Sequence, residues 1–142
     1  MAGSLKKNEL TILIVDDERS IVDTLGAVLE IRGFQVREAY SGEMARKIVE
    51  ERGCPDLIVL DILLPGVNGL DLCRQFKSDP RMKDVPVLMI TVITQDSELA
   101  DGFWNIGTGA DDFVTKPFDP FDMADRIEHL LVRRHGKGSP VC

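Results

Sequence analysis

The apolar residues of this chain fall into two patterns that alternate along its length. Residues 11–16, 57–60 and 85–91 form short apolar runs, which are typical of strands buried on both faces of a parallel sheet. Weaker strand signals are a half-exposed segment at residues 34–39 and a short one at residues 113–115. The pattern therefore predicts five strands.

Between these segments, apolar residues recur every three or four positions, which is the spacing of helices that bury one face. Gly33 is placed to stop the first helix, and Ser41 is placed to cap the second. The third helix should end before Asp79, because a residue that precedes proline disfavours helical geometry. Asp119 as N-cap and Pro120 at the first helical position open the last helix.

Five strands that alternate with five helices predict an α/β fold, in which a parallel sheet lies between two helical layers. The fourth helix is expected at residues 95–106, and the chain from residue 133 onward has the composition of an unpacked tail. In such doubly wound sheets, ligands bind outside the carboxyl ends of the strands. The side chains at those ends are therefore the candidates for chemistry.

Composition narrows the classes of function. The 17 Lys and Arg residues against 24 Asp and Glu residues give a net charge of −7, which opposes attraction to nucleic-acid phosphates. No apolar run approaches the roughly 20 residues of a membrane span, and the N-terminus lacks a signal-peptide segment. We therefore expect a cytoplasmic domain that itself binds neither nucleic acid nor membrane.

Polar or charged residues stand at the ends of four predicted strands. Asp16 and Asp17 end the first strand, Asp61 follows the third, Thr91 ends the fourth and Lys116 follows the fifth. Taken singly, each has an ordinary interpretation as a helix cap, a loop acid, a strand residue or a surface lysine. Their shared position at one edge of the sheet favours a functional site instead.

The three carboxylates of this set repel one another, by roughly 4 kcal/mol for one pair about 4 Å apart at an effective dielectric constant near 20. Oxygen ligands with room for water suit Mg²⁺, and Lys116 adds a second positive charge. A magnesium ion, a lysine and a hydroxyl around one carboxylate form a site for a phosphoryl group, with Asp61 as the nucleophile.

Four segments carry a family resemblance: IVDDE at the end of the first strand, VLDILLPGVNG around Asp61, IT at Thr91, and GADDFVTKPF around Lys116. Together they resemble the receiver domain of two-component response regulators. The resemblance covers about residues 11–133, which leaves residues 1–10 as an N-terminal extension and residues 134–142 as a flexible tail or the start of a linker. It implies a flavodoxin-like three-layer fold with strand order 2-1-3-4-5.

The resemblance also implies roles for single residues. Asp61 matches the phosphoacceptor, Asp17 the direct magnesium ligand, and Asp16 the acid that reaches the metal through water. Leu63 would offer its backbone carbonyl to the metal. Thr91 matches the switch hydroxyl that moves toward the phosphoryl group.

Three residues of the last strand region match further family positions. Lys116 matches the salt-bridge partner of the phosphoryl group, Phe113 matches the aromatic ring that turns inward on activation, and Pro117 matches a proline preceded by a cis peptide bond. For Phe113 the alternative is a static ring of the core.

The chain departs from the family pattern in three respects. Val92 stands where a small residue is usual, so the rate of phosphorylation is an open question. Leu63 and Ile93 flank the phosphoryl site and are apolar, so neither orients an attacking water, and we expect a long-lived acyl phosphate. The 25 residues from Thr91 to Lys116 exceed the usual interval.

The family resemblance also implies partners. The donor would be a histidine kinase or a phosphotransfer protein, and the fourth helix, last strand and last helix would bind a second copy or an effector. Trp104 lies in that region, either folded against the longer loop or exposed as a docking residue.

The leading hypothesis is a phosphorylation-activated switch that does not turn over an outside substrate. A magnesium-dependent phosphohydrolase is a weaker alternative, because Leu63 stands where such an enzyme needs a second acid. A degenerate receiver that serves only as a docking scaffold also remains open.

Overall fold

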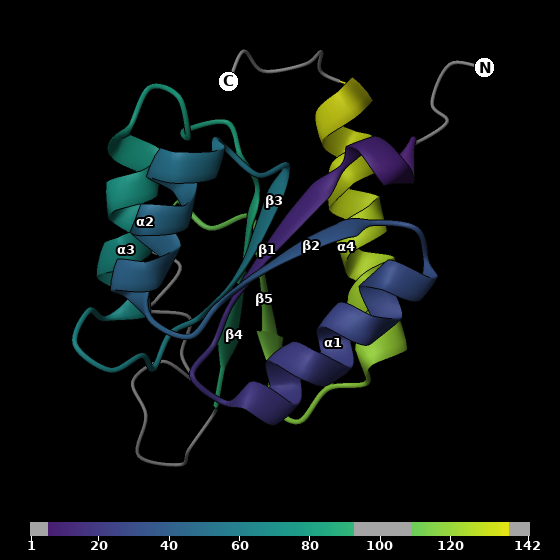
Figure 1. The fold of residues 1–142 in the computed structure, drawn as a ribbon, viewed down its shortest axis with the longest axis horizontal. Coiled ribbons are helices and arrows are strands. Elements are labelled where there is room, and N and C mark those ends of the chain that lie inside the picture. The colour runs from purple at the N-terminus through teal and green to yellow at the C-terminus, as the bar shows by residue number, and fades with distance from the viewer. Residues whose placement is uncertain (1–5, 93–108, 137–142) are drawn as a thin grey trace.

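The computed structural model of the chain describes residues 6–92 and 109–136. Its centre is a parallel sheet of five strands in the order β2-β1-β3-β4-β5 (Figure 1). The strands are β1 (Thr11–Val15), β2 (Gln35–Ala39), β3 (Leu57–Asp61), β4 (Val87–Thr91) and β5 (Asp112–Thr115). The predicted fold class and strand order are therefore confirmed.

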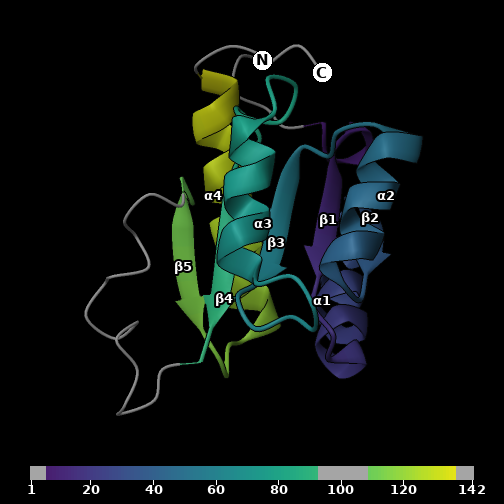
Figure 2. The same ribbon diagram turned by 90° about the vertical axis from the view of Figure 1, so that its left-hand side faces the viewer.

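Four α-helices are described, two on each face of the sheet. Figures 1 and 2 show α2 and α3 on one side of the sheet, with α1 and α4 on the other. Their bounds are α1 (Arg19–Ile31), α2 (Gly42–Arg52), α3 (Gly69–Ser78) and α4 (Pro120–Gly136). The fourth predicted helix, at residues 95–106 with Trp104, lies outside the described residues.

The core consists of two layers because successive side chains of a strand point to opposite faces. Ile12 and Ile14 of β1 pack with α1 and α4, whereas Leu13 and Val15 pack with α2 and α3. All five residues of β1, β3 and β4 are buried, which explains their continuous apolar runs.

Residues at both ends of the predicted domain make contacts with its helices and strands. In the N-terminal extension, Lys7–Glu9 forms a 3-10 helix, Leu10 is buried, and Lys7 Nζ lies 2.5 Å from Glu128 Oε1 of α4. At the other end, the tail expected from residue 134 does not begin there, because α4 continues to Gly136. Arg134 is nearly buried and donates a hydrogen bond to the carbonyl of Asp56, which holds this last turn against the start of β3.

Among the described residues, no helix is both long and apolar enough to cross a membrane.

Candidate functional site

The carboxyl ends of β1, β3, β4 and β5 bring the predicted residues to one edge of the sheet. Asp61 is the last residue of β3 and Thr91 is the last of β4. Asp16 directly follows β1, and its backbone N–H still bonds to the carbonyl of Ala39 at 3.1 Å. Lys116 directly follows β5, and its N–H bonds to the carbonyl of Thr91 at 2.8 Å. Parallel pairing of these strands therefore builds the site.

The carboxylate of Asp61 is buried and held from two sides. Its Oδ1 accepts a hydrogen bond from the N–H of Leu63 at 3.1 Å, and its Oδ2 accepts one from Lys116 Nζ at 3.0 Å. Gly69 packs directly on the backbone here, since a Cβ at that position would lie 2.2 Å from the carbonyl oxygen of Asp61. The loop after β3 thus needs a glycine where helix α3 begins.

Lys116 is shared by three carboxylates. Its Nζ lies 2.9 Å from Glu18 Oε1, 3.0 Å from Asp61 Oδ2 and 3.1 Å from Asp16 Oδ2. Burial lowers the pKa of Lys116, but hydrogen bonds from its ammonium to Glu18 and Asp61 outweigh burial and raise the pKa above its ordinary value. The side chain is therefore a permanent cation at neutral pH.

Asp16 is the most deeply buried acid of the site. Its Oδ1 accepts a hydrogen bond from the N–H of Glu18 at 2.9 Å. Its Oδ2 is close to Lys116 but makes no hydrogen bond of good geometry within the described residues. Burial raises the pKa of Asp16 to about 6, and the negative charge of Asp61 adds to this rise, whereas the hydrogen bond from the Glu18 N–H and the positive charge of Lys116 oppose it.

Asp16, Glu18 and Asp61 each place a carboxylate oxygen within 4.8 Å of the other two. Three ionised acids against one ammonium leave a local charge of −2, which a divalent cation would neutralise. The all-oxygen donor set and the under-bonded Oδ2 of Asp16 fit a hard cation such as Mg²⁺. The residues present can therefore hold a metal.

Two residues lie differently from what the sequence led us to expect. Asp17, the predicted direct ligand, is exposed and does not belong to the group of close carboxylates. Glu18, which we did not single out, lies in that group. A signal was present, because glutamate is a poor N-cap residue and its side chain makes no capping bond to α1.

Thr91 and Phe113 occupy different surroundings. The Thr91 side chain is buried, and its Oγ1 has no hydrogen-bond partner within residues 6–92 and 109–136. Phe113 is partly buried against the core layer formed with α2 and α3. The peptide bond between Lys116 and Pro117 is cis. The ends of the adjacent strands β3, β4 and β5 thus bring together the carboxylate of Asp61, the hydroxyl of Thr91 and the ammonium of Lys116.

The model of one family, described as the response regulator receiver domain, matches residues 12–128. The chain belongs to this family. Its identity as a receiver also makes it a signalling domain of two-component systems rather than an enzyme.

The sequence of this chain is also similar to those of named regulatory proteins. The receiver is 39% identical over 128 residues to the phosphate regulon transcriptional regulatory protein PhoB of Pseudomonas aeruginosa, covering 90% of this chain and 54% of that protein. It is 43% identical over 122 residues to the alkaline phosphatase synthesis transcriptional regulatory protein PhoP of Bacillus subtilis, covering 86% of this chain and 48% of that protein. The chain therefore spans about half the length of these relatives.

The fold is also similar to those of solved response-regulator structures. A putative response regulator from Chloroflexus aurantiacus superposes with a TM-score of 0.77 at 36% identity, covering 87% of this chain and 98% of that one. A CheY-like receiver domain protein from Methanospirillum hungatei gives a TM-score of 0.80 at 26% identity, covering 91% and 98%.

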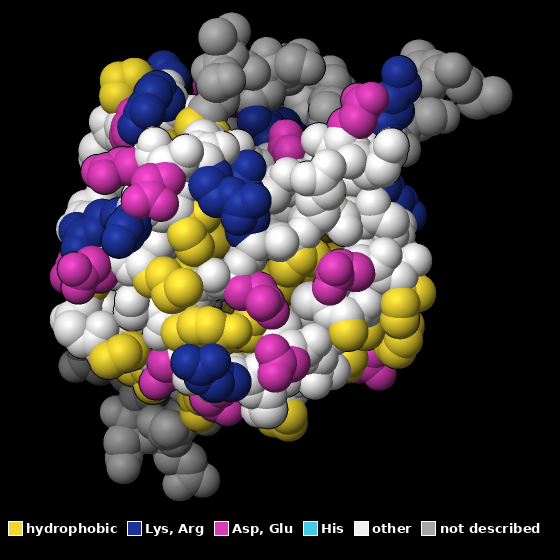
Figure 3. All heavy atoms as spheres, in the orientation of Figure 1, with side chains coloured by type: hydrophobic (Ala, Val, Ile, Leu, Met, Phe, Trp, Pro, Cys, Tyr) yellow, Lys and Arg dark blue, Asp and Glu magenta, His cyan; other side chains and the backbone are white. Residues whose placement is uncertain are grey.

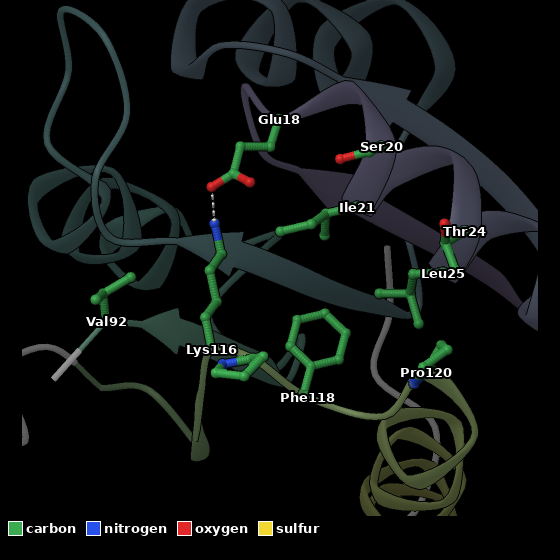
Figure 4. Close-up of a pocket in the computed structure, with 10 residues that line it drawn as sticks. Glu18, Ser20, Ile21, Thr24, Leu25, Val92, Lys116, Phe118 and Pro120 are labelled. Carbon is green, nitrogen blue, oxygen red and sulfur yellow. Dashed lines mark hydrogen bonds and ion pairs between the residues drawn. The ribbon is translucent and has the colours of Figure 1, made fainter.

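An open pocket of about 560 Å³ adjoins the acidic group of the receiver (Figure 4). Glu18 and Lys116 line one end of it, next to Val92, while Thr24 and Pro120 lie at the other end. The wall between these ends is mostly apolar; it consists of Ile21, Leu25, Pro117 and Phe118.

Proposed function

We propose that Asp61 accepts a phosphoryl group from the phosphohistidine of a histidine kinase or phosphotransfer protein, and that this switches the receiver between two conformations. The contact of Asp61 Oδ2 with Lys116 Nζ, 3.0 Å apart at the buried end of β3, is the main support. It joins the predicted nucleophile to the predicted cation although 55 residues separate them in the sequence.

In the proposed reaction, a carboxylate oxygen of Asp61 attacks phosphorus and the bond from phosphorus to the donor imidazole breaks. The electron pair of that bond stays on the imidazole nitrogen, which takes up a proton from solvent, so that the imidazole leaves as the neutral base. Lys116 is placed to pair with the phosphoryl oxygens, which bring about −2 charge and three acceptors. A bound magnesium ion would neutralise phosphoryl charge; Asp16, Asp61, Asp17 and the Leu63 carbonyl are its proposed ligands, with Glu18 beside them.

The switch itself would use the hydroxyl of Thr91, which has no hydrogen-bond partner within the described part of the chain. A buried hydroxyl without a partner is costly, so a phosphoryl oxygen within reach would attract it. We propose that Thr91 then moves toward the phosphoryl group and that Phe113 turns into the space it leaves. Phosphorylation would thereby shift a pre-existing equilibrium between two states.

The acyl phosphate should be long-lived. The Leu63 side chain is 62% exposed, so it borders the site on the solvent side and offers no group to orient a water. Replacing it by a polar residue, Leu63→Asn, should speed the decay of phosphorylated protein, measured by phosphate release. Equal decay in both proteins would contradict this explanation.

The partners proposed for this receiver follow from its exposed surfaces. The open pocket beside Lys116 gives a donor protein room to approach this edge of the sheet, and Val92, 39% exposed, lines it. The face in Figure 3 carries acidic and basic side chains interspersed without a continuous basic patch, and this supports a receiver that leaves nucleic-acid binding to another domain.

The output would lie in a separate domain or partner, because the named relatives are transcriptional regulators about twice as long. Of the proposed dimer or effector surface, β5 and α4 are described, whereas Trp104 lies outside the described residues. We propose that the receiver works in the cytoplasm, where histidine kinases present their phosphohistidine.

One experiment tests the function. The protein is treated with a small phosphodonor or with beryllofluoride, with and without Mg²⁺, beside Asp61→Asn. We expect modification that requires both Mg²⁺ and Asp61, without turnover of an external substrate. Binding of partners that does not change on phosphorylation would instead indicate a docking scaffold.

Magnesium alone should also stabilise the fold, by about 1.4 kcal/mol at ten times its dissociation constant. Thermal unfolding with and without Mg²⁺ measures this effect, and Asp16→Asn should reduce it. An unchanged melting temperature at saturating Mg²⁺ would count against a formed metal site.

A further inference from the structure

Glu18 is the residue of the acidic group to which the proposed function assigns no task of its own. It is the N-cap of α1, yet its side chain makes no capping hydrogen bond to that helix. Its Oε1 instead accepts a hydrogen bond from Lys116 Nζ at 2.9 Å, while its side chain is 55% exposed. The carboxylate is therefore committed to Lys116 rather than to the helix.

The pair of Glu18 and Lys116 separates the open pocket from the buried acids. Both residues line the pocket, whereas Asp16 and Asp61 do not. Figure 4 shows the pair across one end of the pocket, with Glu18 approaching the ammonium from the N-cap position before α1. The ammonium of Lys116 thus has Glu18 on its pocket side and Asp16 and Asp61 on its buried side.

Phosphorylation changes the charge that Lys116 has to balance. When Asp61 becomes an acyl phosphate, one carboxylate charge is replaced by about −2 on the phosphoryl oxygens. These oxygens need the ammonium that Glu18 holds, and the Glu18 carboxylate would also repel them. Glu18 therefore favours the unphosphorylated arrangement over the phosphorylated one.

From this geometry we infer that Glu18 is a positioning residue that restrains Lys116 and so opposes phosphorylation of Asp61. The inference rests on the proposed function of Asp61 as phosphoacceptor. Because the Glu18 side chain is 55% exposed, its restraint on Lys116 is modest, and its loss should change phosphorylation roughly two- to fivefold.

The test compares Glu18→Gln with the unaltered protein at Mg²⁺ concentrations that saturate each. The amide keeps the size of the side chain and removes its charge, so we expect a phosphorylation rate with a small phosphodonor roughly two- to fivefold higher, and beryllofluoride binding tighter by a similar factor. Glu18→Asp keeps the charge on a shorter side chain, and it should lie between the two proteins in both measurements.

A matched control is Glu30→Gln, which makes the same charge change at the exposed far end of α1. It should leave both measurements unaltered, and melting temperatures show whether each variant is folded. A merely structural role for Glu18 would lower the melting temperature without raising the rate.

A rate and an affinity in Glu18→Gln at or below those of the unaltered protein would overturn the inference while leaving the proposed function intact. Absence of Asp61-dependent modification in the unaltered protein would overturn the proposed function, and this inference with it.

Discussion

Two lysines at opposite ends of the sheet each use their ammonium for three contacts, but their partners differ in charge. Near the amino ends of β4 and β5, Lys77 Nζ meets one carboxylate, Asp111 Oδ2 at 3.1 Å, and the carbonyls of Val85 at 2.7 Å and Lys83 at 3.3 Å. At the carboxyl ends, Lys116 meets three carboxylates.

The difference separates a structural cluster from a functional one. The ion pair of Lys77 and Asp111 at the amino end is neutral, and Asp111 Oδ2 also accepts a hydrogen bond from the N–H of Val87 at 2.8 Å. Among residues 6–92 and 109–136, the cluster at the carboxyl end keeps an excess charge of −2, and Asp16 Oδ2 and Thr91 Oγ1 lack a hydrogen-bond partner. Folding alone does not require that excess, whereas binding a cation and a phosphoryl group does.

The largest expected effect comes from removing each lysine in turn. Lys116→Met should slow phosphorylation of Asp61 about a hundredfold or more, because it removes a cation placed on the reacting group. Lys77→Met should leave that rate unchanged but lower the free energy of unfolding by about 1–3 kcal/mol, because it removes the partner of Asp111 and of two carbonyls.

Phosphorylation assays and denaturant unfolding on both variants measure this contrast at a temperature where both are folded. Equal loss of phosphorylation in the two variants would remove the distinction between the clusters.

A smaller effect concerns the pH dependence of stability without divalent cations. Burial raises the pKa of Asp16 from 3.8 to about 6, so between these values the folded protein holds a proton that the unfolded chain has lost. The free energy of unfolding should therefore fall as pH rises through this window, by at most about 3 kcal/mol, since one pKa unit corresponds to about 1.4 kcal/mol.

Asp16→Asn should remove this component of the slope, whereas Asp111→Asn should retain it. Unfolding titrations from pH 4 to pH 7 compare the three proteins. If the pH dependence of the free energy of unfolding is the same in Asp16→Asn and in the unaltered protein, the proton that the folded protein holds is not bound by Asp16.

The sequence located most, but not all, of the residues that meet at the carboxyl end of the sheet. Apolar runs that stop at a polar residue located Asp61, Thr91 and Lys116, because strand ends in a parallel sheet share an edge. The pattern did not reveal which of the acids after β1 faces inward. Asp16 continues the strand through its bond to Ala39, which leaves Asp17 exposed, and the chain then turns so that Glu18 returns to Lys116.

Other features depend on contacts between distant residues that periodicity cannot show. Arg134 looked like part of a charged tail, but it packs on Asp56, 78 residues earlier, and extends α4 by a turn. The strand order came from resemblance to a family, because alternation of strands and helices alone is compatible with several orders.

The smallest effect tests whether the unpartnered hydroxyl serves the switch rather than the fold. Thr91→Val replaces the buried hydroxyl by a methyl group of similar size. Stability should stay equal or rise by up to about 1 kcal/mol, because Thr91 Oγ1 has no hydrogen-bond partner to lose among the described residues. The same variant should lose the shift of Phe113 that beryllofluoride induces, observed by NMR, while Thr91→Ser keeps it. A clear loss of stability in Thr91→Val would show that the hydroxyl supports the fold, and Thr91 would then have a structural role like that of the groups around Lys77.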